Sequence, residues 1–275
     1  MQIRIFTILV VALVFAACGK KPATEAELAQ AHFLAAEQYF ADNKLNAAKF
    51  ELDTIKSLYP KQVAVRRRAD SLFIKIQLIE LKRNLVYADS LLRVKQPSLD
   101  SAARNFVFEK NESYEDLGNY VYKALRTEVK AGSTYIKPLV DENGNFLLTS
   151  VLYGGAIGHY QARFSVGSLF AETDKVTPDM GYSHSFVDNG STIETVIYKG
   201  DSNKEIAAFV QQNADKAILV TLTGAKGKRS YTLSAAERKA ISESYNLSVI
   251  VSDVRNLERI VETSKKKIIL YENEI

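Results

Sequence analysis

Apolar positions follow a helical rhythm over the first half of the chain. From Thr24 to about Lys130, glycine is almost absent and Ala, Leu, Glu and Lys are dense. Apolar residues recur there with the spacing that places them on one face of a helix. Thr24 and Glu27 have the spacing of a capping box, so we predict that the first helix starts at this point. Residues 24–131 are expected to form a helical region.

Residues 63–95 carry apolar side chains on more than one stripe, which predicts one long helix that packs on at least two partners. Pro97-Ser98 is expected to break this helix, because proline cannot continue helical hydrogen bonding. A further helix is predicted up to about Lys110, and another from Tyr114 through Val129.

The rhythm changes near Gly132, where β-branched and aromatic residues appear between turn signals. Two hairpins are predicted around Asn143-Gly144 and Asn189-Gly190, because both residues of an Asn-Gly pair tolerate positive φ. The expected strands are Tyr135 to Val140, Phe146 to Tyr153, Tyr160 to Gly167, Ser183 to Val187, Thr192 to Tyr198, Ala217 to Thr223 and Ser230 to Leu233.

Two short helices are expected among these strands, over 203–213 and 235–244. Each follows a capping-box pattern, formed by Ser202 with Glu205 and by Ser234 with Glu237. The arrangement predicts that 132–245 forms an α+β domain with an antiparallel sheet.

The last segment, 246–275, has the most regular pattern of all. Two interleaved rows recur every seven residues, as in a coiled coil; they are Leu247, Val254, Val261 and Ile268, and Ile250, Leu257, Ser264 and Tyr271. A short strand over 247–251 competes for its beginning, since consecutive β-branched residues favour extension.

A hydrophobic seam of this kind needs a partner. We expect the C-terminal helix to pack on the helix at 63–95, which makes the β-rich region an insertion on a helical stalk. Alternatively, the seam pairs with a second chain and forms a homodimer.

Composition narrows the class of protein. The chain is 47% hydrophobic and 25% charged, which is ordinary for a globular protein and argues against wholesale disorder. The formal net charge is only +4, so nothing points to nucleic acid as a partner.

A hydrophobic leader segment precedes the helical region. Arg4 is followed by an uncharged run from Ile5 to Ala17, and then by Cys18, the single cysteine. The run falls short of the about 20 residues that a membrane-spanning helix needs. We therefore interpret 1–17 as a signal peptide rather than as a permanent span.

The segment Phe15-Ala16-Ala17-Cys18 resembles a bacterial lipoprotein lipobox. The resemblance implies cleavage before Cys18, a diacylglyceryl group on its thiol, and a new amino terminus acylated by a fatty acid such as palmitate. Residues 18–23 would then be the lipid anchor and linker; the alternative is a free core cysteine. Gly19 after the cysteine suggests an outer-membrane lipoprotein, and Lys20-Lys21 gives no acidic surface-export tract, so a periplasm-facing position is expected.

The first helical hairpin resembles a tetratricopeptide repeat. The resemblance is carried by Ala36, Tyr39, Ala48, Leu52 and Pro60, with the turn at Asp42-Asn43 between the helices. It covers one repeat, and about three are needed to bury the faces of a solenoid. We therefore expect a repeat-like hairpin completed by other helices.

The sequence contains no convincing motif for catalysis or for cofactor binding. The stretch at 223–230 has the wrong spacing for a phosphate-binding loop, and a hairpin turn fits there. At 141–146 the chain begins like a calcium loop, but Phe146 stands where glycine is required, so a turn is expected. The three histidines are too dispersed for a zinc motif. We predict no cofactor, no metal and no catalytic residue.

Aromatic residues are frequent in the β-rich region and could stack on a ligand, although most should belong to the core. Tyr153, His159 and Tyr160 are the candidate ligand contacts, because they flank a glycine-rich loop.

The function that the sequence favours is a lipid-anchored cell-envelope protein that acts as a non-enzymatic scaffold for an envelope protein partner, since repeat-like hairpins make binding surfaces. The alternatives are a glycan or small-ligand binder that uses the β-rich domain, and an enzyme of unknown class.

Overall fold

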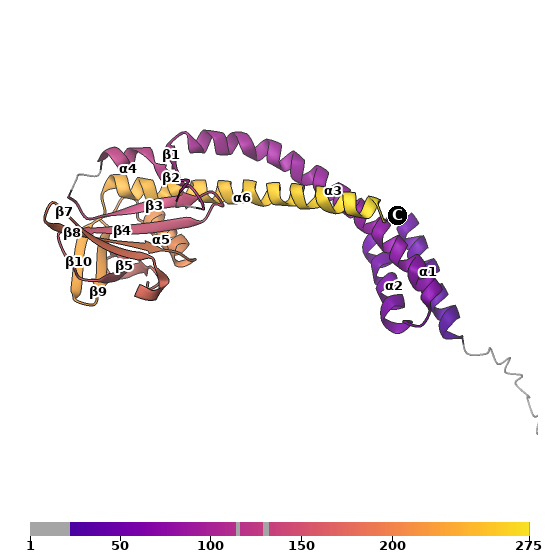
Figure 1. The fold of residues 1–275 in the computed structure, drawn as a ribbon. Helices are drawn as coiled ribbons and strands as arrows, with labels where there is room; N and C mark the ends of the chain where they lie inside the picture. The colour runs from indigo at the N-terminus through magenta and orange to yellow at the C-terminus, as the bar shows by residue number, and fades with distance from the viewer. Residues whose placement is uncertain (1–22, 114–115, 129–131, 275) are drawn as a thin grey trace, which may run out of the picture. The chain divides into compact units, whose positions relative to one another are not determined.

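The computed structural model describes residues 23–113, 116–128 and 132–274 (Figure 1). These residues form helices and antiparallel sheets, so the expected α+β class is confirmed. The described residues divide into two compact units: unit 1 comprises 23–80 with 269–274, and unit 2 comprises those within Leu81–Ile268.

Unit 1 is built around an antiparallel helical hairpin, formed by α1 (Glu25–Ala41) and α2 (Leu45–Leu58). The predicted capping box is present: Glu27 N donates to Thr24 Oγ1 over 3.3 Å, and Thr24 N donates to Glu27 Oε2 over 2.8 Å. The predicted turn is also present, with Asn43 at a φ of 60°. The first half of α3 (Val63–Ala103) completes the unit.

The core of unit 1 is wholly apolar, since its buried cluster consists of Phe33, Ala36, Leu45, Ala48, Leu52, Ile55, Ala69, Leu72 and Ile76. Ala36 and Ala48 have no exposed surface, which lets α1 and α2 approach closely. At the margin, His32 Nδ1 lies 2.6 Å from Glu51 Oε2 and links the two helices.

The predicted break at Pro97-Ser98 is wrong, because α3 continues through Pro97 to Ala103. Pro97 and Arg93 are both exposed, so water can reach the Arg93 carbonyl, which loses its helical partner. Past the proline, Leu99, Ala102 and Ala103 pack against the main core of unit 2, and this burial favours continuation of the helix.

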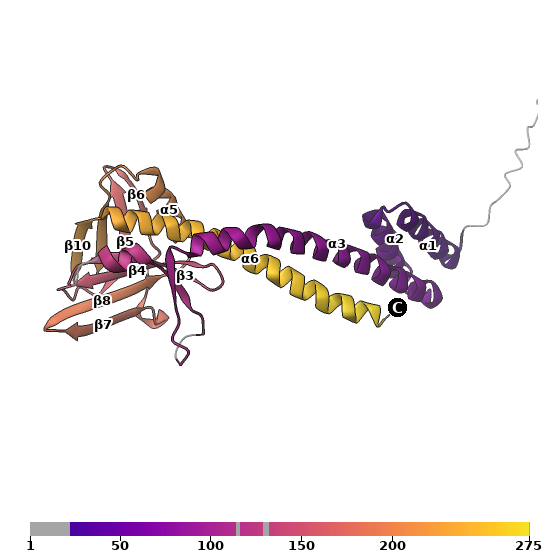
Figure 2. The same ribbon diagram turned by 90° about the horizontal axis from the view of Figure 1, so that it is seen from above.

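Unit 2 contains two antiparallel sheets (Figure 2). Sheet A has the order β1-β2-β3-β4-β8-β7, and sheet B has the order β10-β9-β5-β6. Their strands are β1 (Phe106–Glu109), β2 (Asn119–Tyr122), β3 (Tyr135–Asp141), β4 (Phe146–Tyr153), β5 (His159–Val166), β6 (Leu169–Glu172), β7 (Ser183–Asp188), β8 (Ser191–Tyr198), β9 (Leu219–Gly224) and β10 (Gly227–Thr232). Both Asn-Gly hairpins and the hairpin across 223–230 are confirmed.

The helices predicted up to Lys110 and from Tyr114 through Val129 are confirmed only in part, by the end of α3 at Ala103 and by the short α4 (Lys123–Glu128). Elsewhere they are wrong, because the chain forms β1 and β2 there; residues 114, 115 and 129 lie outside the described part. Phe106 and Tyr122 lie opposite each other in the β1–β2 pair, and both are buried. Gly118 lies so close to the Phe108 ring that a Cβ there would clash with it.

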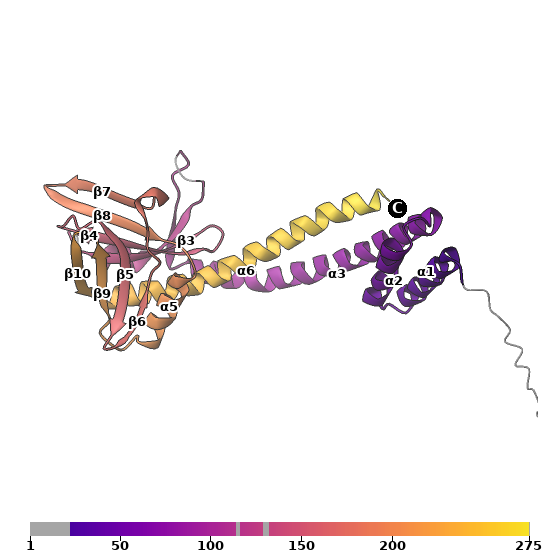
Figure 3. The ribbon, with the colours of Figure 1, turned by 90° about the horizontal axis from the view of Figure 1, so that it is seen from below.

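Three further helical segments belong to unit 2: α5 (Ser202–Gln212), the 3-10 turn η1 (Pro178–Met180) and α6 (Ala235–Glu272), whose last turn belongs to unit 1. α5 lies against β6 (Figure 3). The capping box at Ser234 and Glu237 is confirmed. The box at Ser202 is wrong, because Ser202 Oγ donates instead to Asp174 Oδ2 over 3.1 Å.

α6 covers three segments that the sequence analysis predicts as separate elements. The predicted helix 235–244, the competing strand at 247–251 and the heptad segment are one continuous helix. Of the heptad positions, Leu247, Val254, Leu257 and Ser264 are buried. Lys95 Nζ on α3 pairs with Asp253 Oδ2 on α6, so these two helices of unit 2 contact one another.

The core of unit 2 lies between the inner faces of the two sheets, with α5 and the first half of α6. Phe164, Tyr198, Val210 and Val251 belong to this one cluster. The β3–β4 turn packs directly on α6, since a Cβ at Gly144 would lie 2.4 Å from Ser252 N.

Candidate functional site

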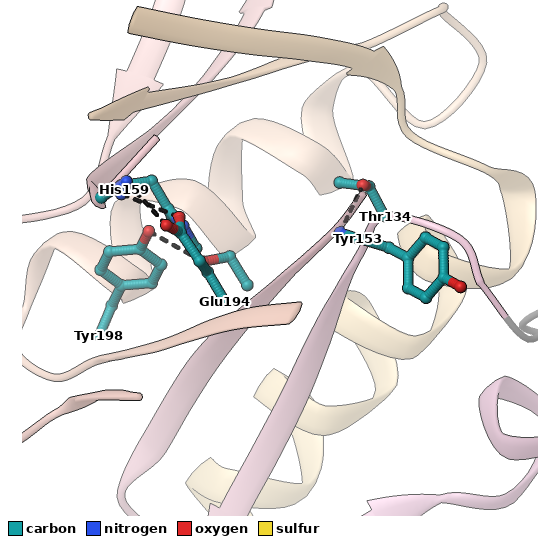
Figure 4. Close-up of polar contacts among 7 residues, drawn as sticks. Thr134, Tyr153, His159, Glu194 and Tyr198 are labelled. Atoms are coloured by element: carbon teal, nitrogen blue, oxygen red, sulfur yellow. Dashed lines mark hydrogen bonds and ion pairs between the residues drawn. The ribbon is translucent and has the colours of Figure 1, made fainter. Parts of the chain in front are cut away.

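A line of four hydrogen-bonded side chains crosses the core of unit 2, and we call it the polar chain: Glu194, His159, Ser150 and Tyr198. His159 Nδ1 lies 2.8 Å from Glu194 Oε2, and His159 Nε2 lies 2.7 Å from Ser150 Oγ. Ser150 Oγ lies 3.0 Å from Tyr198 Oη. Figure 4 shows His159, Glu194 and Tyr198 pointing toward one another.

Both sheets contribute to the polar chain. Ser150 lies on β4, and Glu194 and Tyr198 lie on β8, next to β4 in sheet A; His159 begins β5 of sheet B. Side chains alternate between the two faces of a strand, so residues two or four apart share a face. Glu194, Val196 and Tyr198 therefore all point inward from β8, and the polar chain joins the two sheets through their shared core.

The charges and protons of the polar chain can be assigned. Burial lowers the pKa of His159 and outweighs the opposite effect of Glu194, so the imidazole is neutral at pH 7. Burial raises the pKa of Glu194, but hydrogen bonds from the His159 side chain and from the Gly158 and His159 amides outweigh it and hold the pKa below its usual range. Glu194 is therefore ionised.

A single direction of donation follows from these states. The carboxylate of Glu194 only accepts, so His159 Nδ1 carries the proton and donates to it. His159 Nε2 then accepts from the Ser150 hydroxyl, which in turn accepts from the Tyr198 hydroxyl. Burial raises the pKa of Tyr198, which keeps this last donor protonated.

The order Ser150, His159, Glu194 has the hydrogen-bond pattern of a serine hydrolase triad. Ser150 has no exposed surface, and it lines neither of the two hollows described below. Its oxygen is already engaged by both His159 and Tyr198. A nucleophile must reach its substrate, so we interpret the polar chain as a support for Glu194, whose side chain keeps a small exposed surface.

Glu194 lies in the wall of a cleft of ≈ 500 Å³. The side chain of Glu194 is 8% exposed, whereas that of His159 is fully buried behind it. Most of the lining surface is apolar, and the residues around it are Gly158, His159, Tyr160, Lys175, Val176, Thr177, Pro178, Ser183, His184, Ser185, Glu194, Val196 and Ala225. The cleft thus combines an apolar wall with one buried negative charge.

A second hollow, of ≈ 560 Å³, is polar, and Tyr160 and Lys175 line both hollows. Hydroxyl, amide and charged side chains of β5 and β9 line it, including Gln161, Arg163 and Thr221. The Arg163 guanidinium lies over the Phe170 ring, 3.4 Å from its centroid. We call this second hollow the polar hollow.

Of the three candidate ligand contacts, the structure brings two together. His159 and Tyr160 line the cleft. Tyr153 does not, and Figure 4 shows it apart from His159, near Thr134. It is three residues after Ser150 on β4, an odd spacing that places it on the opposite face of sheet A. Cys18 lies outside the described residues.

Sequence reasoning missed Ser150, Glu194 and Tyr198. Each sits at an inward position of a strand that was predicted, so the alternation of β4 and β8 was available as a signal. A serine and a glutamate at core positions are the anomaly, since buried polar groups need partners. Their pairing with His159 depends on the meeting of two sheets, which alternation does not reveal.

The comparisons with known proteins add no relative: no family model matches the chain, and no curated protein or solved structure is significantly similar to it. In the described part of the chain, no group of three or more His, Cys, Asp or Glu side chains is placed to hold a metal ion. None of the helices described has the length and hydrophobicity that a membrane span requires.

Proposed function

We propose that this protein is a lipid-anchored, non-enzymatic binding protein of the bacterial cell envelope, and that the cleft beside Glu194 takes a small, mainly apolar ligand. The observation that carries this proposal is the cleft itself. Its volume falls in the range of about 300–1,000 Å³ that is typical of small-molecule sites, which are also largely apolar with a few placed polar groups.

The role of Glu194 follows from its surroundings. A carboxylate that is almost buried keeps its charge here because three donors hold it, namely Gly158 N, His159 N and His159 Nδ1. Lone pairs beyond these bonds accept a hydrogen bond from a ligand. The preferred ligand therefore has an apolar body and an N–H or O–H donor.

The uncharged fluorophore 1-N-phenylnaphthylamine tests this chemistry, since it has an apolar body and a single N–H. We expect its fluorescence to rise on binding to the full chain. Ala225→Phe should reduce binding at least tenfold, because Ala225 lines the cleft. Ser168→Phe, which lines only the polar hollow, is the matched control and should bind normally. Equal affinity in all three chains would dismiss the cleft as the site.

The polar hollow favours a second ligand class. Its hydroxyl and amide groups beside an aromatic side chain are suited to a glycan. A glycan array probed with the parent chain and with Tyr160→Ala tests this alternative, and Tyr153→Ala is the control because Tyr153 lies on another face.

A scaffold role remains the second candidate function, and unit 1 supplies the observation that favours it. Phe50 and Leu58 on α2 are 72% and 65% exposed, so this helix presents two large apolar side chains to solvent. We infer that the tetratricopeptide-like hairpin offers this surface to an envelope protein. Crosslinking in intact membranes should recover one stoichiometric partner, and the double change Phe50→Ser with Leu58→Ser should abolish it. Recovery of this protein alone would contradict the role.

The anchor is part of the proposal. The lipobox-like segment supports acylation of Cys18 and residence in the outer membrane, facing the periplasm. Labelling cells with an alkyne analogue of palmitate should mark the parent chain but not Cys18→Ser, which should also leave the membrane fraction. An unlabelled parent chain would contradict the anchor.

We infer further that the heptad seam of α6 serves within the chain, as a coiled-coil-like pair with α3. Burial of Val254 and Leu257 and the Lys95–Asp253 ion pair support this use. A carbodiimide, which joins an amine directly to a carboxylate, should link Lys95 to Asp253 within one chain. A bond between chains would favour the homodimer through the heptads.

A further inference from the structure

The four strands at the sheet edges differ in how they are protected against pairing. β1 and β6 are short, with four residues each, and β10 carries Lys228 and Arg229. Short strands and basic side chains are common ways to prevent an edge from adding a further strand. β7 has six residues, no proline, no lysine and no bulge in its pairing with β8.

β7 also lies open to solvent. All six of its residues are exposed, and Phe186 and Val187 are 53% and 69% exposed. In Figures 2 and 3, β7 is the outermost strand next to β8. An exposed apolar edge of this length is the kind that pairs with another chain.

The direction of the free backbone groups follows from the pairing with β8. Tyr182 O accepts from Ile197 N, so residue 182 directs its backbone toward β8. In an antiparallel ladder this direction alternates along the strand. The backbone N–H and C=O groups of Ser183, Ser185 and Val187 therefore point to the open edge.

The side chains of β7 form a self-complementary pattern. His184, Phe186 and Asp188 share one face of sheet A, since they lie opposite Thr195, Ile193 and Ser191 on β8. When a second copy of this strand pairs antiparallel about a two-fold axis at Phe186, each His184 meets the partner's Asp188 and the two Phe186 rings meet. An imidazole N–H and a carboxylate are complementary.

We propose that β7 is a dimerisation edge, which pairs with β7 of a second copy of this chain in the register Phe186 to Phe186. Ser185 and Val187 of each chain then exchange hydrogen bonds with Val187 and Ser185 of the other, and the two sheets A become continuous. The occupant is a second copy rather than an unrelated peptide, because the His184 and Asp188 match arises only when the strand meets itself.

This inference does not depend on the ligand in the cleft, nor on the heptads. It does place the two clefts near the two-fold axis, because Ser183 and Ser185 line the cleft. The proposed function can fail while the dimer stands, and the reverse also holds.

A disulfide tests the register in the full chain with Cys18→Ser. Residues that face each other without hydrogen bonds have Cα atoms about 4.5 Å apart, within the range of a disulfide. Phe186→Cys should therefore form a covalent dimer under mild oxidation. Ser185→Cys is the matched control: its counterpart is displaced by two residues, beyond the about 7 Å limit, so it should stay monomeric. Crosslinking of Ser185→Cys and not of Phe186→Cys would overturn the proposal.

A charge exchange tests the pairing without cysteines. Both side chains are exposed, so the changes should not disturb folding. His184→Asp sets two carboxylates against each other in each of two symmetric contacts, and should weaken the dimer by about tenfold. Adding Asp188→His to that variant should restore the affinity to within about threefold of the parent. Sedimentation at tens of micromolar measures both. A parent chain that is monomeric throughout, or a double variant as weak as the single one, would overturn the proposal.

Discussion

The buried interiors of units 1 and 2 differ in the polarity of their side chains. In the described part of the chain, the buried cluster of unit 1 contains only apolar side chains, whereas every buried polar or charged side chain lies in unit 2. The contacts differ in range as well. α1 and α2 are neighbours in sequence, but Glu237 accepts from Ile136 N across 101 positions.

The difference shows where each unit gains its specificity. An apolar helical core tolerates substitution, because different apolar side chains of suitable volume can fill it. A buried polar group must find its partner or it destabilises the fold. The polar chain therefore fixes how sheets A and B meet, and it holds Glu194 ionised at the cleft. We expect the two units to respond differently to the loss of one group.

The largest expected effect is that of Glu194→Ala. It leaves three buried donors, Gly158 N, His159 N and His159 Nδ1, without their acceptor and should lower the stability of unit 2 by about 4 kcal/mol, since each unsatisfied buried donor costs about 1–3 kcal/mol. Hydrogen exchange read by peptide should show faster exchange in unit 2, with α1 and α2 unchanged. Glu172→Ala, a half-exposed carboxylate on β6, should stay within about 0.5 kcal/mol of the parent. Equal effects of the two changes would contradict the role of the polar chain.

The features that could be predicted from the sequence also differ between those set by local residues and those set by distant contacts. The capped helix α1, the Asn43 turn and both Asn-Gly hairpins depend on residues close in sequence, and all were predicted. The errors arose where distant contacts decide. Burial of Leu99 and Ala103 favours the helix beyond Pro97, and pairing with β3 makes Asn119–Tyr122 a strand.

The candidate site was predicted only in part, for a related reason. His159 and Tyr160 were recognised because the glycines beside them signal a loop. Glu194 and Tyr198 looked like ordinary strand residues, since nothing in the sequence shows which strand of sheet B will face them. Tyr153 was a candidate because it is an aromatic residue beside the glycine-rich loop. Its side chain, however, lies on the other face of β4.

A core truncation in unit 1 gives the opposite test and the second largest effect. Ile55 is fully buried in the apolar cluster, so Ile55→Ala should destabilise unit 1 by about 3 kcal/mol through lost burial and a cavity. Exchange should quicken in α1 and α2 and stay unchanged in β4, β5 and β8. Ile55→Leu keeps the volume and should cost less than about 1.5 kcal/mol. Faster exchange across both units would mean that they unfold together.

Low pH should also distinguish the two units, because it should lower the stability of unit 2. The folded pKa of His159 lies below its ordinary value of 6.5, so below that pH the unfolded chain binds a proton that the folded chain does not. Stability of unit 2 should thus fall by up to about 1.4 kcal/mol per pH unit below about pH 6.5. Glu194, with a pKa below its ordinary 4.5, adds to the loss below about pH 4.5.

Urea unfolding at several pH values, followed by near-ultraviolet circular dichroism, measures this slope. His159→Gln should flatten it between pH 6.5 and 5.5, whatever its effect on stability at pH 7. A slope that persists in His159→Gln would assign the acid sensitivity to other groups.

The smallest effect probes the far end of the polar chain. Tyr198→Phe removes a hydroxyl that only donates to Ser150, and Ser150 can still donate to His159. The loss should be about 1 kcal/mol, the net value of one neutral hydrogen bond. Tyr39→Phe on α1 is the matched change in unit 1, where the ring is half-buried beside an apolar core, and should have almost no effect. Hydrogen exchange on each unit compares the two. If Tyr39→Phe proved the more damaging, the contrast between a polar and an apolar interior would not explain how the units are stabilised, because the hydroxyl in unit 2 would then be dispensable.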